Sequence, residues 1–267
     1  MKSRRICRPL SNALVSLPLA LVLLCAAPTP ALALGDWIGA EGSYWHQSQD
    51  GGASIDGSIL NGTTFDFHDT LGLDKTDNTV MGRVWFRWSK TRLVFDYFDS
   101  SRSGDTTLGQ SFVFDDKLYT AGQNLKSDLD VKLLQGKFLF SIADLKLVDV
   151  GLGLGVNQAK IKMDLNGSVS GQASLDQSVP YPTLAAYVTI KPLPGFHIKA
   201  ELNGVQATVS GTHVDIIDAR VQAEMYVAHV LGFFAGYRQF RFDVTDKDFG
   251  SVNNTYKGPY IGLGVKF

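Results

Sequence analysis

The feature that most constrains this chain is a two-residue alternation of apolar and polar side chains, repeated in segments of about ten residues from position 37 to the C-terminus. The segment 146–158 shows it most clearly, because Val148, Val150, Leu152, Leu154 and Val156 alternate with Asp149, Gly151, Gly153, Gly155 and Asn157. Successive side chains of a β-strand point to opposite faces. The pattern therefore predicts strands with one apolar and one polar face.

Ten such segments can be assigned, and the connections between them fall into two classes. We expect strands near 37–47, 79–88, 127–140, 146–158, 181–191, 196–205, 216–227, 231–242 and 257–267, and one more directly after Ser89–Thr91. Four connections are short, near Ser89, Ala143, Leu193 and His229, and five are longer, at about 48–78, 102–126, 159–180, 206–215 and 243–256. Short periplasmic turns that alternate with long extracellular loops are typical of outer-membrane barrels. The sequence predicts an all-β fold, a closed antiparallel up-and-down transmembrane β-barrel of ten strands over 34–267, or of eight if two weak segments form loop hairpins.

The N-terminus has the layout of an export signal. An apolar stretch from Leu14 to Ala27 is followed by the small-x-small sequence Ala31-Leu32-Ala33. It is preceded by the basic residues Lys2, Arg4, Arg5 and Arg8. The stretch is short and interrupted for a helix that must cross about 30 Å of hydrocarbon. We therefore expect residues 1–33 to be a signal peptide, cleaved after Ala33.

Cleavage would also change the composition of the remaining chain. Both cysteines, Cys7 and Cys25, would leave with the signal, so no disulfide is expected in the exported protein. A lipoprotein signal at Cys25 is disfavoured because Leu24 stands where a small residue is needed. The formal net charge would change from −1 to about −5. That negative charge argues against nucleic acid as a partner.

The segment 127–140 departs from simple alternation. Leu129, Val131 and Leu133 share one phase, whereas Leu134 and Phe138 share the other. The phase of the apolar residues changes between Leu133 and Leu134. This change indicates either a β-bulge or a strand that projects beyond the membrane.

Charged side chains recur on the faces that we assign to the lumen. A charge inside a barrel must be paired or hydrated. We therefore predict a cross-strand network of ion pairs that plugs the barrel, and the rival interpretation is a charged lining of an open conductive pore. The predicted members are Glu41, Arg83, Arg87, Asp96, Asp149, Lys199, Glu201, Arg220, Glu224 and Arg238. Trp85 and Tyr187 should also point inward, and small barrels fill with their own side chains.

Two pairs of residues near the long connections suggest a catalytic alternative. They are Asp128 with Asp130, and His213 with Asp215. Carboxylates and a histidine together can activate a water molecule, and the pairs are similar to the acidic and Asp/His pairs of omptins, which are outer-membrane proteases. A lipid A-modifying hydrolase would instead use a serine or carboxylate beside a histidine. The sequence offers no wider likeness to either enzyme, so the expected protein is not an enzyme.

Metal and cofactor sites are not predicted. The acidic stretch around Asp246 and Asp248 lacks the glutamate of a calcium-binding EF-hand loop. No cysteine or histidine spacing indicates zinc, and no glycine-rich loop precedes a helix. We expect no cofactor.

The two longest connections contain apolar residues that a solvated linker would not need. They are Phe65, Phe67, Leu71 and Leu73 in 48–78, and Phe112, Val113 and Phe114 in 102–126. One hypothesis is that these side chains pack together over the barrel mouth, where they cap the lumen or form a site for an apolar ligand. The other is that they belong to extended barrel walls.

The last eight residues carry a resemblance to a known class. They alternate apolar side chains with small ones and end in phenylalanine, with Tyr260, Gly262, Val265 and Phe267 as key positions. This resembles the C-terminal assembly signal of bacterial outer-membrane proteins. With Gly236-Tyr237-Arg238 late in the chain, the whole pattern is similar to small barrels of the OmpA and OmpW type. The resemblance implies a monomer in the outer membrane of a Gram-negative bacterium, with the barrel assembly machinery, membrane lipid and lipopolysaccharide as partners.

The function predicted from these features is coarse. We expect a non-enzymatic outer-membrane barrel that contributes to envelope integrity, surface interaction or the porin-like passage of a small solute, an apolar one included. A plugged lumen would indicate a structural protein, and an open lumen would indicate a channel.

Overall fold

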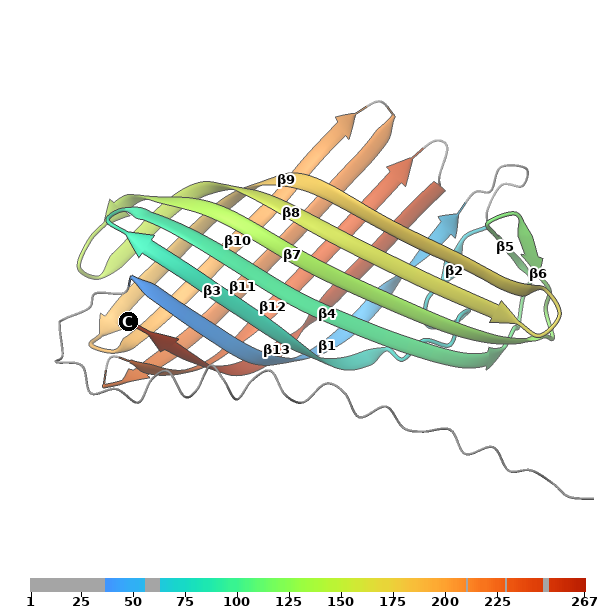
Figure 1. Ribbon diagram of the computed structural model, residues 1–267, viewed down its shortest axis with the longest axis horizontal. Helices are drawn as coiled ribbons and strands as arrows, with labels where there is room; N and C mark the ends of the chain where they lie inside the picture. The colour runs from blue at the N-terminus through green and yellow to red at the C-terminus, as the bar shows by residue number, and fades with distance from the viewer. Residues whose placement is uncertain (1–36, 56–62, 210, 229, 247–249) are drawn as a thin grey trace, which may run out of the picture. The chain divides into compact units, whose positions relative to one another are not determined.

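Ten long strands form a closed antiparallel barrel, shown in Figure 1. The structure is a computed structural model that describes residues 37–267 except 56–62, 210, 229 and 247–249. Each strand pairs with the next along the chain, and the last pairs with the first. The ten strands are β1 (Ile38–Ile55), β3 (Thr76–Trp88), β4 (Thr91–Thr107), β7 (Asn124–Asp144), β8 (Val148–Gly167), β9 (Gly171–Leu193), β10 (Phe196–Val209), β11 (Thr212–Val227), β12 (Leu231–Asp246) and β13 (Gly250–Lys266).

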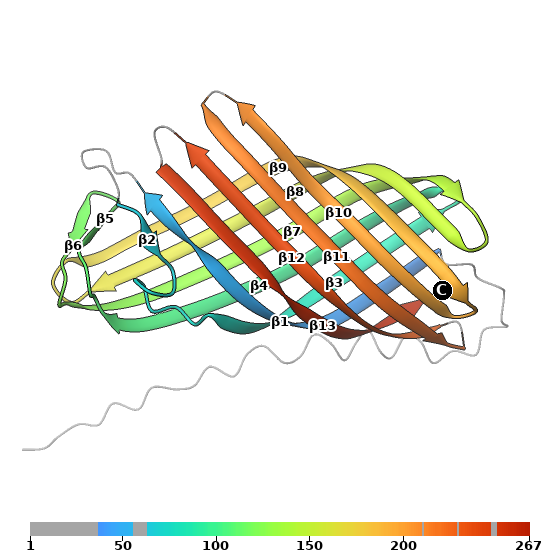
Figure 2. The same ribbon diagram turned by 180° about the vertical axis from the view of Figure 1, so that it is seen from behind.

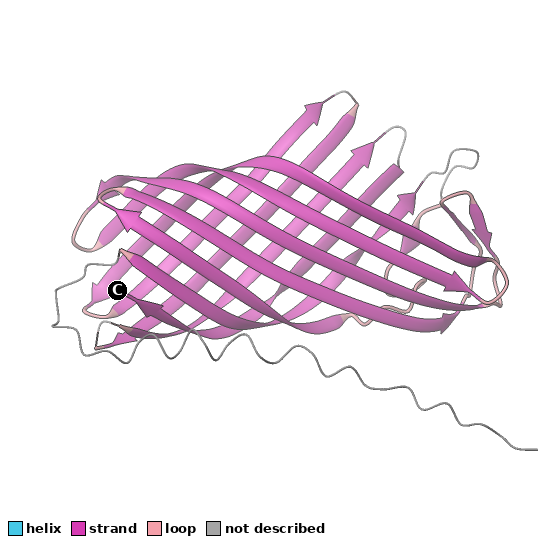
Figure 3. Ribbon diagram, in the orientation of Figure 1, coloured by secondary structure: helices cyan, strands magenta, loops and turns pink. Residues whose placement is uncertain are grey.

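The predicted all-β class and the ten strands are confirmed, and the eight-strand alternative is wrong. Figure 3 shows strands and loops throughout the described part of the chain, and no helix there is long and apolar enough to cross a membrane. The expected signal peptide, residues 1–33, lies outside the described residues, as does His229 in one of the short turns. Two of the short turns contain a residue with a positive φ angle, Ser89 in one and Gly195 in the other. This conformation allows the chain to reverse direction within a few residues.

The strands are longer than the alternation predicts. Only 168–170 separates β8 from β9, and only 210–211 separates β10 from β11, whereas the predicted loops were 159–180 and 206–215. The strands also extend into the other three predicted loops, 48–78, 102–126 and 243–256. β7, β8 and β9 have 21, 20 and 23 residues, about twice the 9–11 that cross a bilayer. The backbone ladder therefore continues well beyond the length that a membrane requires.

The barrel has two halves with opposite patterns. We call the half next to the short turns and the two described chain ends the basal half, and the half next to the long connections the distal half. The outward side chains of the basal half are apolar and exposed, and include Val80, Phe86, Phe95, Phe138, Leu152, Leu154, Leu184, Leu202, Val221, Phe233, Ile261 and Leu263. Tyr44, Trp88, Tyr97 and Tyr237 belong to the same exposed belt, at the positions expected of interfacial aromatic residues.

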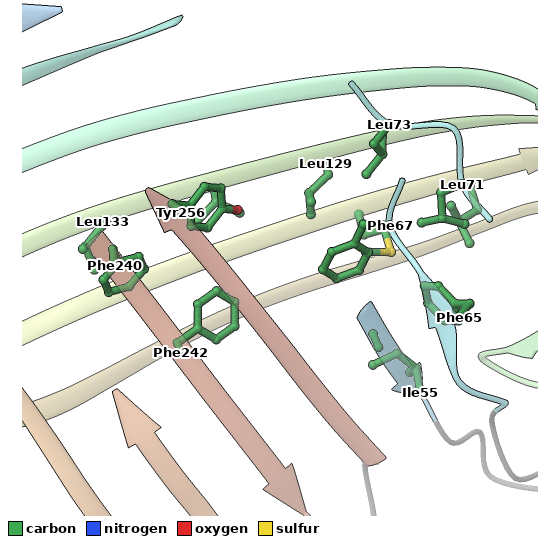
Figure 4. Packing of buried hydrophobic residues seen from close by; sticks show 14 of the residues in the cluster. Ile55, Phe65, Phe67, Leu71, Leu73, Leu129, Leu133, Phe240, Phe242 and Tyr256 are labelled. Carbon is green, nitrogen blue, oxygen red and sulfur yellow. The ribbon is translucent and has the colours of Figure 1, made fainter. Parts of the chain in front are cut away.

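In the distal half the faces exchange character. The outward residues there are mainly polar or charged and include Asp99, Lys126, Asp128, Lys132, Lys160, Asp176, Gln239 and Lys257. The inward residues form a buried apolar cluster that includes Trp45, Phe98, Leu125, Leu129, Leu133, Met163, Leu165, Phe240, Phe242 and Tyr256. Figure 4 shows part of this cluster between the strands. The distal half thus has the pattern of a sheet in water around an apolar core.

The irregular segment 127–140 is explained by this exchange. Alternation of buried and exposed residues continues along β7 through Leu133 and Leu134 without a slip. Its inward row changes from apolar residues, up to Leu133, to polar residues, from Gln135. The predicted bulge at Leu133–Leu134 is therefore wrong, and the pattern fits the other prediction, a strand that continues beyond the apolar belt. A register shift does occur in β7, but between Ser141 and Ala143.

Two short elements complete the distal end. β2 (Phe65–Asp66) pairs with β1, and β5 (Phe112–Phe114) forms a hairpin with β6 (Lys117–Tyr119). The ring of Phe65 lies 5.0 Å from that of Phe112 and 6.0 Å from that of Phe114, measured between centroids. Phe67, Leu71 and Leu73 are buried in the same cluster. The predicted packing of the two connections is confirmed, and we call residues 63–73 and 112–119 the cap.

Candidate functional site

The basal lumen is filled by ion pairs that centre on Arg83. Its guanidinium donates to both carboxylate oxygens of Asp96, at 2.6 and 3.2 Å, and to both of Glu201, at 2.6 Å each. Arg83 and Asp96 are direct cross-strand neighbours on β3 and β4, whereas Glu201 lies on β10. Lys137 from β7 lies 2.7 Å from Asp96 and 3.3 Å from Glu201. The four charges tie opposite walls of the barrel together.

Four further predicted lumen residues, Arg220, Lys199, Glu224 and Glu41, join this cluster or lie next to it. Arg220 lies 3.4 Å from Asp96. Lys199 lies 2.5 Å from Glu224 and 3.9 Å from Glu41, with its ammonium 5.6 Å from the centroid of the Trp85 ring. All of these groups are at least four-fifths buried, and each positive charge has a carboxylate partner. Such pairing offsets the cost of removing the charges from water.

A second cluster lies nearer the short turns. Arg87 donates to Asp144 at 3.0 Å and lies 4.0 Å from Asp149. Asp149 is fully buried and accepts hydrogen bonds from Arg92, Ser141 and Tyr187. The structure therefore places all ten predicted lumen residues inside the barrel, in more than one group.

Sequence reasoning left Lys137, Asp218 and Arg92 out of the network. Asp218 forms a two-bond pair with Arg238, at 2.9 and 2.7 Å, and accepts a third bond from Gln135. These residues follow the same inward alternation as the predicted members, so parity along the strands could have found them. Arg238 also lies over the rings of Trp45 and Phe98, at 5.2 and 4.8 Å. It therefore marks the boundary between the charged basal lumen and the apolar distal interior.

Little free space remains in the basal lumen. The cavities around Trp85, Arg83 and Lys199 have volumes of about 30, 10 and 30 Å³. A single water needs roughly 10–15 Å³ in this measure. Each of these spaces is large enough for only a few water molecules.

The distal half contains a much larger cavity, of about 380 Å³. Its lining comes from β7, β8, β9, β11, β12 and β13, and is almost wholly apolar: Val131, Leu133, Ala159, Ile161, Leu175, Gln177, Val179, Pro180, Tyr181, Thr212, Val214, Ile216, Phe240, Phe242, Val244, Asp246 and Val252. Figure 4 shows Leu133, Phe240 and Phe242 at this end of the cluster. The volume lies within the range of about 300–1,000 Å³ typical of ligand sites.

At the floor of this cavity, the inward residues of the strands change from apolar to polar or charged. On β11, Ile216 lines the cavity and Asp218, two residues further along, belongs to the ion pairs. On β12 the same step separates Phe240 from Arg238. Because inward residues are spaced two apart along a strand, the apolar and charged layers are in direct contact.

The polar groups at the cavity are few. Asp246 is the one charged residue in its described lining, and Thr212 donates a hydrogen bond to the Asp246 carboxylate. The lining also includes Gln177, whose side chain carries an amide. A carboxylate at the site disfavours an anionic ligand by like-charge repulsion. The cavity is therefore suited to a neutral, apolar molecule.

The candidate catalytic residues are not brought together. Asp128 and Asp130 lie on the outward face of β7, and His213 and Asp215 lie on the outward face of β11, with β8, β9 and β10 between them in the sheet. His213 is hydrogen-bonded to Thr208, and Asp215 is paired with Arg241 at 2.5 Å. The two pairs form no joint site in this arrangement.

The residues of the predicted assembly signal close the barrel. Val265 is the register partner of Ala40 on β1, and Phe267 accepts a backbone hydrogen bond from Trp37 at 2.8 Å. Tyr260 points inward and donates to Gln222 at 2.8 Å. An added Cβ at Gly262 would lie 2.4 Å from the ring of Phe234. Glycine is therefore required there for Phe234 to occupy the lumen.

Comparison with known proteins supports the fold. The structure is similar to the outer membrane protease OmpT from Escherichia coli, with a TM-score of 0.60 at 11% identity, over 87% of this chain and 97% of that one. Weaker similarities are to the attachment invasion locus protein Ail of Yersinia pestis (TM-score 0.38, 13% identity, 86% and 99% of the chains) and to the toluene transporter TodX of P. putida (0.37, 8%, 87% and 91%). No protein-family model and no curated protein sequence matches the chain. At this identity the likeness to OmpT shows the fold alone.

Proposed function

We propose that this protein is a non-enzymatic outer-membrane barrel that binds small neutral apolar molecules in its distal half and does not conduct ions through its basal half. The exposed apolar belt supports the membrane location. Side chains such as Leu152, Leu154 and Leu184 are more than half exposed, although they are apolar. Such a continuous belt is stable only against lipid. Membrane lipid and lipopolysaccharide are then its immediate surroundings.

The observation that carries the binding function is the apolar cavity of about 380 Å³. An engineered apolar cavity of about 150 Å³ is large enough for benzene. By that scale the cavity suits a molecule of roughly fifteen carbon atoms. It lies beyond the membrane belt and directly above the layer of ion pairs, so the site has a closed floor.

Binding of the neutral probe N-phenyl-1-naphthylamine tests this function. The purified protein in lipid nanodiscs should bind the probe saturably, and Ala159→Phe, which adds a ring inside the cavity, should weaken binding at least about tenfold. Gln158→Phe is the matched control, because it adds the same ring on the outward face of the same strand. Equal binding by the two variants would show that the probe binds elsewhere.

Electrical recording in planar bilayers tests the closed lumen. We expect no stable, large conductance steps, because the charges around Arg83 fill the interior. Regular large steps from the purified protein would contradict the proposal and favour a pore.

A further inference from the structure

The barrel wall is open on one side of the distal half. β9 and β10 pair from Leu193 and Phe196 as far as Leu184 and Gly204, and their pairing stops there. β9 continues to Gly171 paired with β8 alone, and β10 continues to Val209 paired with β11 alone. Figures 1 and 2 show the β10–β11 hairpin diverging from β8 and β9 beyond this point. We call the opening between 171–183 and 205–209 the lateral gap.

Two prolines account for where the pairing ends. Pro180 and Pro182 follow directly beyond Leu184 on β9, on the side away from the paired segment. Proline has no N–H to donate to a neighbouring strand and is confined to strand edges. Both prolines keep their register with β8, so the missing donors affect the β10 side. The gap is therefore encoded in the chain and is not a frayed end.

The apolar cavity lies directly behind the gap. Its lining includes residues of β9 and of β11, but none from the described residues of β10, the strand between them. Val179 belongs to the inward row of β9 and is 53% exposed, whereas Tyr181, two residues nearer the paired segment, is 7% exposed. The exposure of the inward row of β9 thus rises where β10 no longer pairs with it, as expected if the cavity opens along this edge.

The gap begins at the distal border of the apolar belt. Leu184 and Leu202, just below it, are exposed and apolar, whereas Ser178 and Gln206, beside the opening, are polar. The opening therefore starts where the belt gives way to the polar outer surface. The cap packs Phe65 against Phe112 and Phe114, and its Tyr119 donates a hydrogen bond to the backbone oxygen of Gly171 at the end of β9.

We propose that the lateral gap is the route by which neutral apolar molecules pass between the outer leaflet and the cavity. This inference rests on the proposed binding function and adds its access route. A molecule dissolved in the leaflet reaches the cavity by moving sideways at the membrane border, without crossing the polar outer surface or the ion pairs of the lumen.

Cross-linking of the gap tests the route. In a continuation of the observed register, Pro182 on β9 would face Gln206 on β10. The double variant Pro182→Cys/Gln206→Cys, in the chain without residues 1–33, is joined by a thiol-cleavable bismaleimide. The control is Gln239→Cys/Lys257→Cys, whose positions are outward register partners on the paired strands β12 and β13. The chain's own cysteines, Cys7 and Cys25, are absent from this form.

Stopped-flow fluorescence then measures association and dissociation of N-phenyl-1-naphthylamine in nanodiscs. The cross-linked gap should slow both rates at least about tenfold while the Kd stays within about twofold, and reductive cleavage of the linker should restore the rates. The control pair should leave them unchanged. Unchanged rates in fully cross-linked protein would overturn the lateral route and leave the binding function standing. Absence of saturable binding before cross-linking would instead overturn the binding function itself.

Discussion

The basal and distal halves are built from the same strands, yet their inner and outer faces are exchanged. On β8, Leu152 and Leu154 point outward in the basal half, whereas Lys160 points outward in the distal half. The inward row changes in the opposite sense, from Asp149 to Met163 and Leu165. In the proposed membrane location, each half places apolar groups against the less polar of its two surroundings, which is lipid outside the basal half and the protein interior in the distal half. One continuous sheet can therefore have an apolar outer face in one half and a polar outer face in the other.

The two interiors also depend on different forces. The basal interior needs complete pairing, because one unpaired charge in a confined lumen costs several kcal/mol. The distal interior depends on burial of apolar surface, at about 25 cal/mol per Å². Empty space is consequently tolerated in the distal half, where a cavity of about 380 Å³ lies, but not among the basal charges.

The largest expected effect is the loss of a central basal charge. Arg83→Met leaves Asp96 and Glu201 short of their main partner and should lower the free energy of unfolding by about 3–5 kcal/mol. Urea titration of the refolded protein in vesicles measures it. The matched variant is Arg102→Met in the distal half, since Arg102 is also buried but has two N–H groups without a hydrogen-bond partner.

Burial lowers the pKa of Arg102, so its charge is a burden on the folded state. We expect Arg102→Met to change stability by no more than about 1 kcal/mol, in either direction. Similar losses for both variants would mean that the two halves do not treat charge differently.

The second effect concerns the outward faces. Leu152→Arg places a charge in the apolar belt and should cost about 2–4 kcal/mol. Lys160→Leu, on the same face of β8 but in the distal half, should change stability by less than about 0.5 kcal/mol. Refolding yields into vesicles of defined thickness compare the two. A reversed ranking would show that the membrane border does not lie between Leu152 and Lys160.

The cap provides a third, smaller effect. Phe114 is fully buried against Phe65. Phe114→Ser should raise the rate of proteolysis within 102–126 on intact cells about tenfold, which equals about 1.4 kcal/mol in the local opening equilibrium. The wild-type protein should resist cleavage there. Rapid cleavage of the wild type would show that the cap is not packed on the living cell.

The last comparison concerns assembly at the C-terminus rather than stability. Deletion of Phe267 removes backbone hydrogen bonds to Trp37 and Ile38 at the barrel seam, worth about 1 kcal/mol each. Phe267 is also a key position of the segment that resembles an assembly signal. The deletion should therefore strongly reduce the amount of assembled protein, while the protein that does assemble keeps most of its stability. Heat-modifiable gel mobility and membrane levels measure both quantities. Normal levels of the truncated protein would argue against a role in assembly.

The local pattern of the sequence was sufficient for the ten strands, their order, their inward and outward faces and the short turns. These follow from period-two alternation and from turn residues, which act over a few neighbours. The same alternation identified all ten predicted lumen charges as inward. It did not reveal that β8 and β9 continue into 159–180. There the outward residues are no longer apolar, and a strand without an apolar outward face is taken for a loop if every strand is assumed to lie within the membrane.

Only the tertiary structure decided which inward groups meet. Arg83 and Glu201 are 118 positions apart in the chain, and no local pattern pairs them. The cavity likewise depends on six strands that together leave a space, and the lateral gap depends on the divergence of β9 and β10. Pro180 and Pro182 are a local signal of a strand edge, whereas the cavity behind them depends on residues far apart in the chain. Alternation specifies the direction of each side chain, whereas barrel closure and strand register specify its neighbours across the lumen.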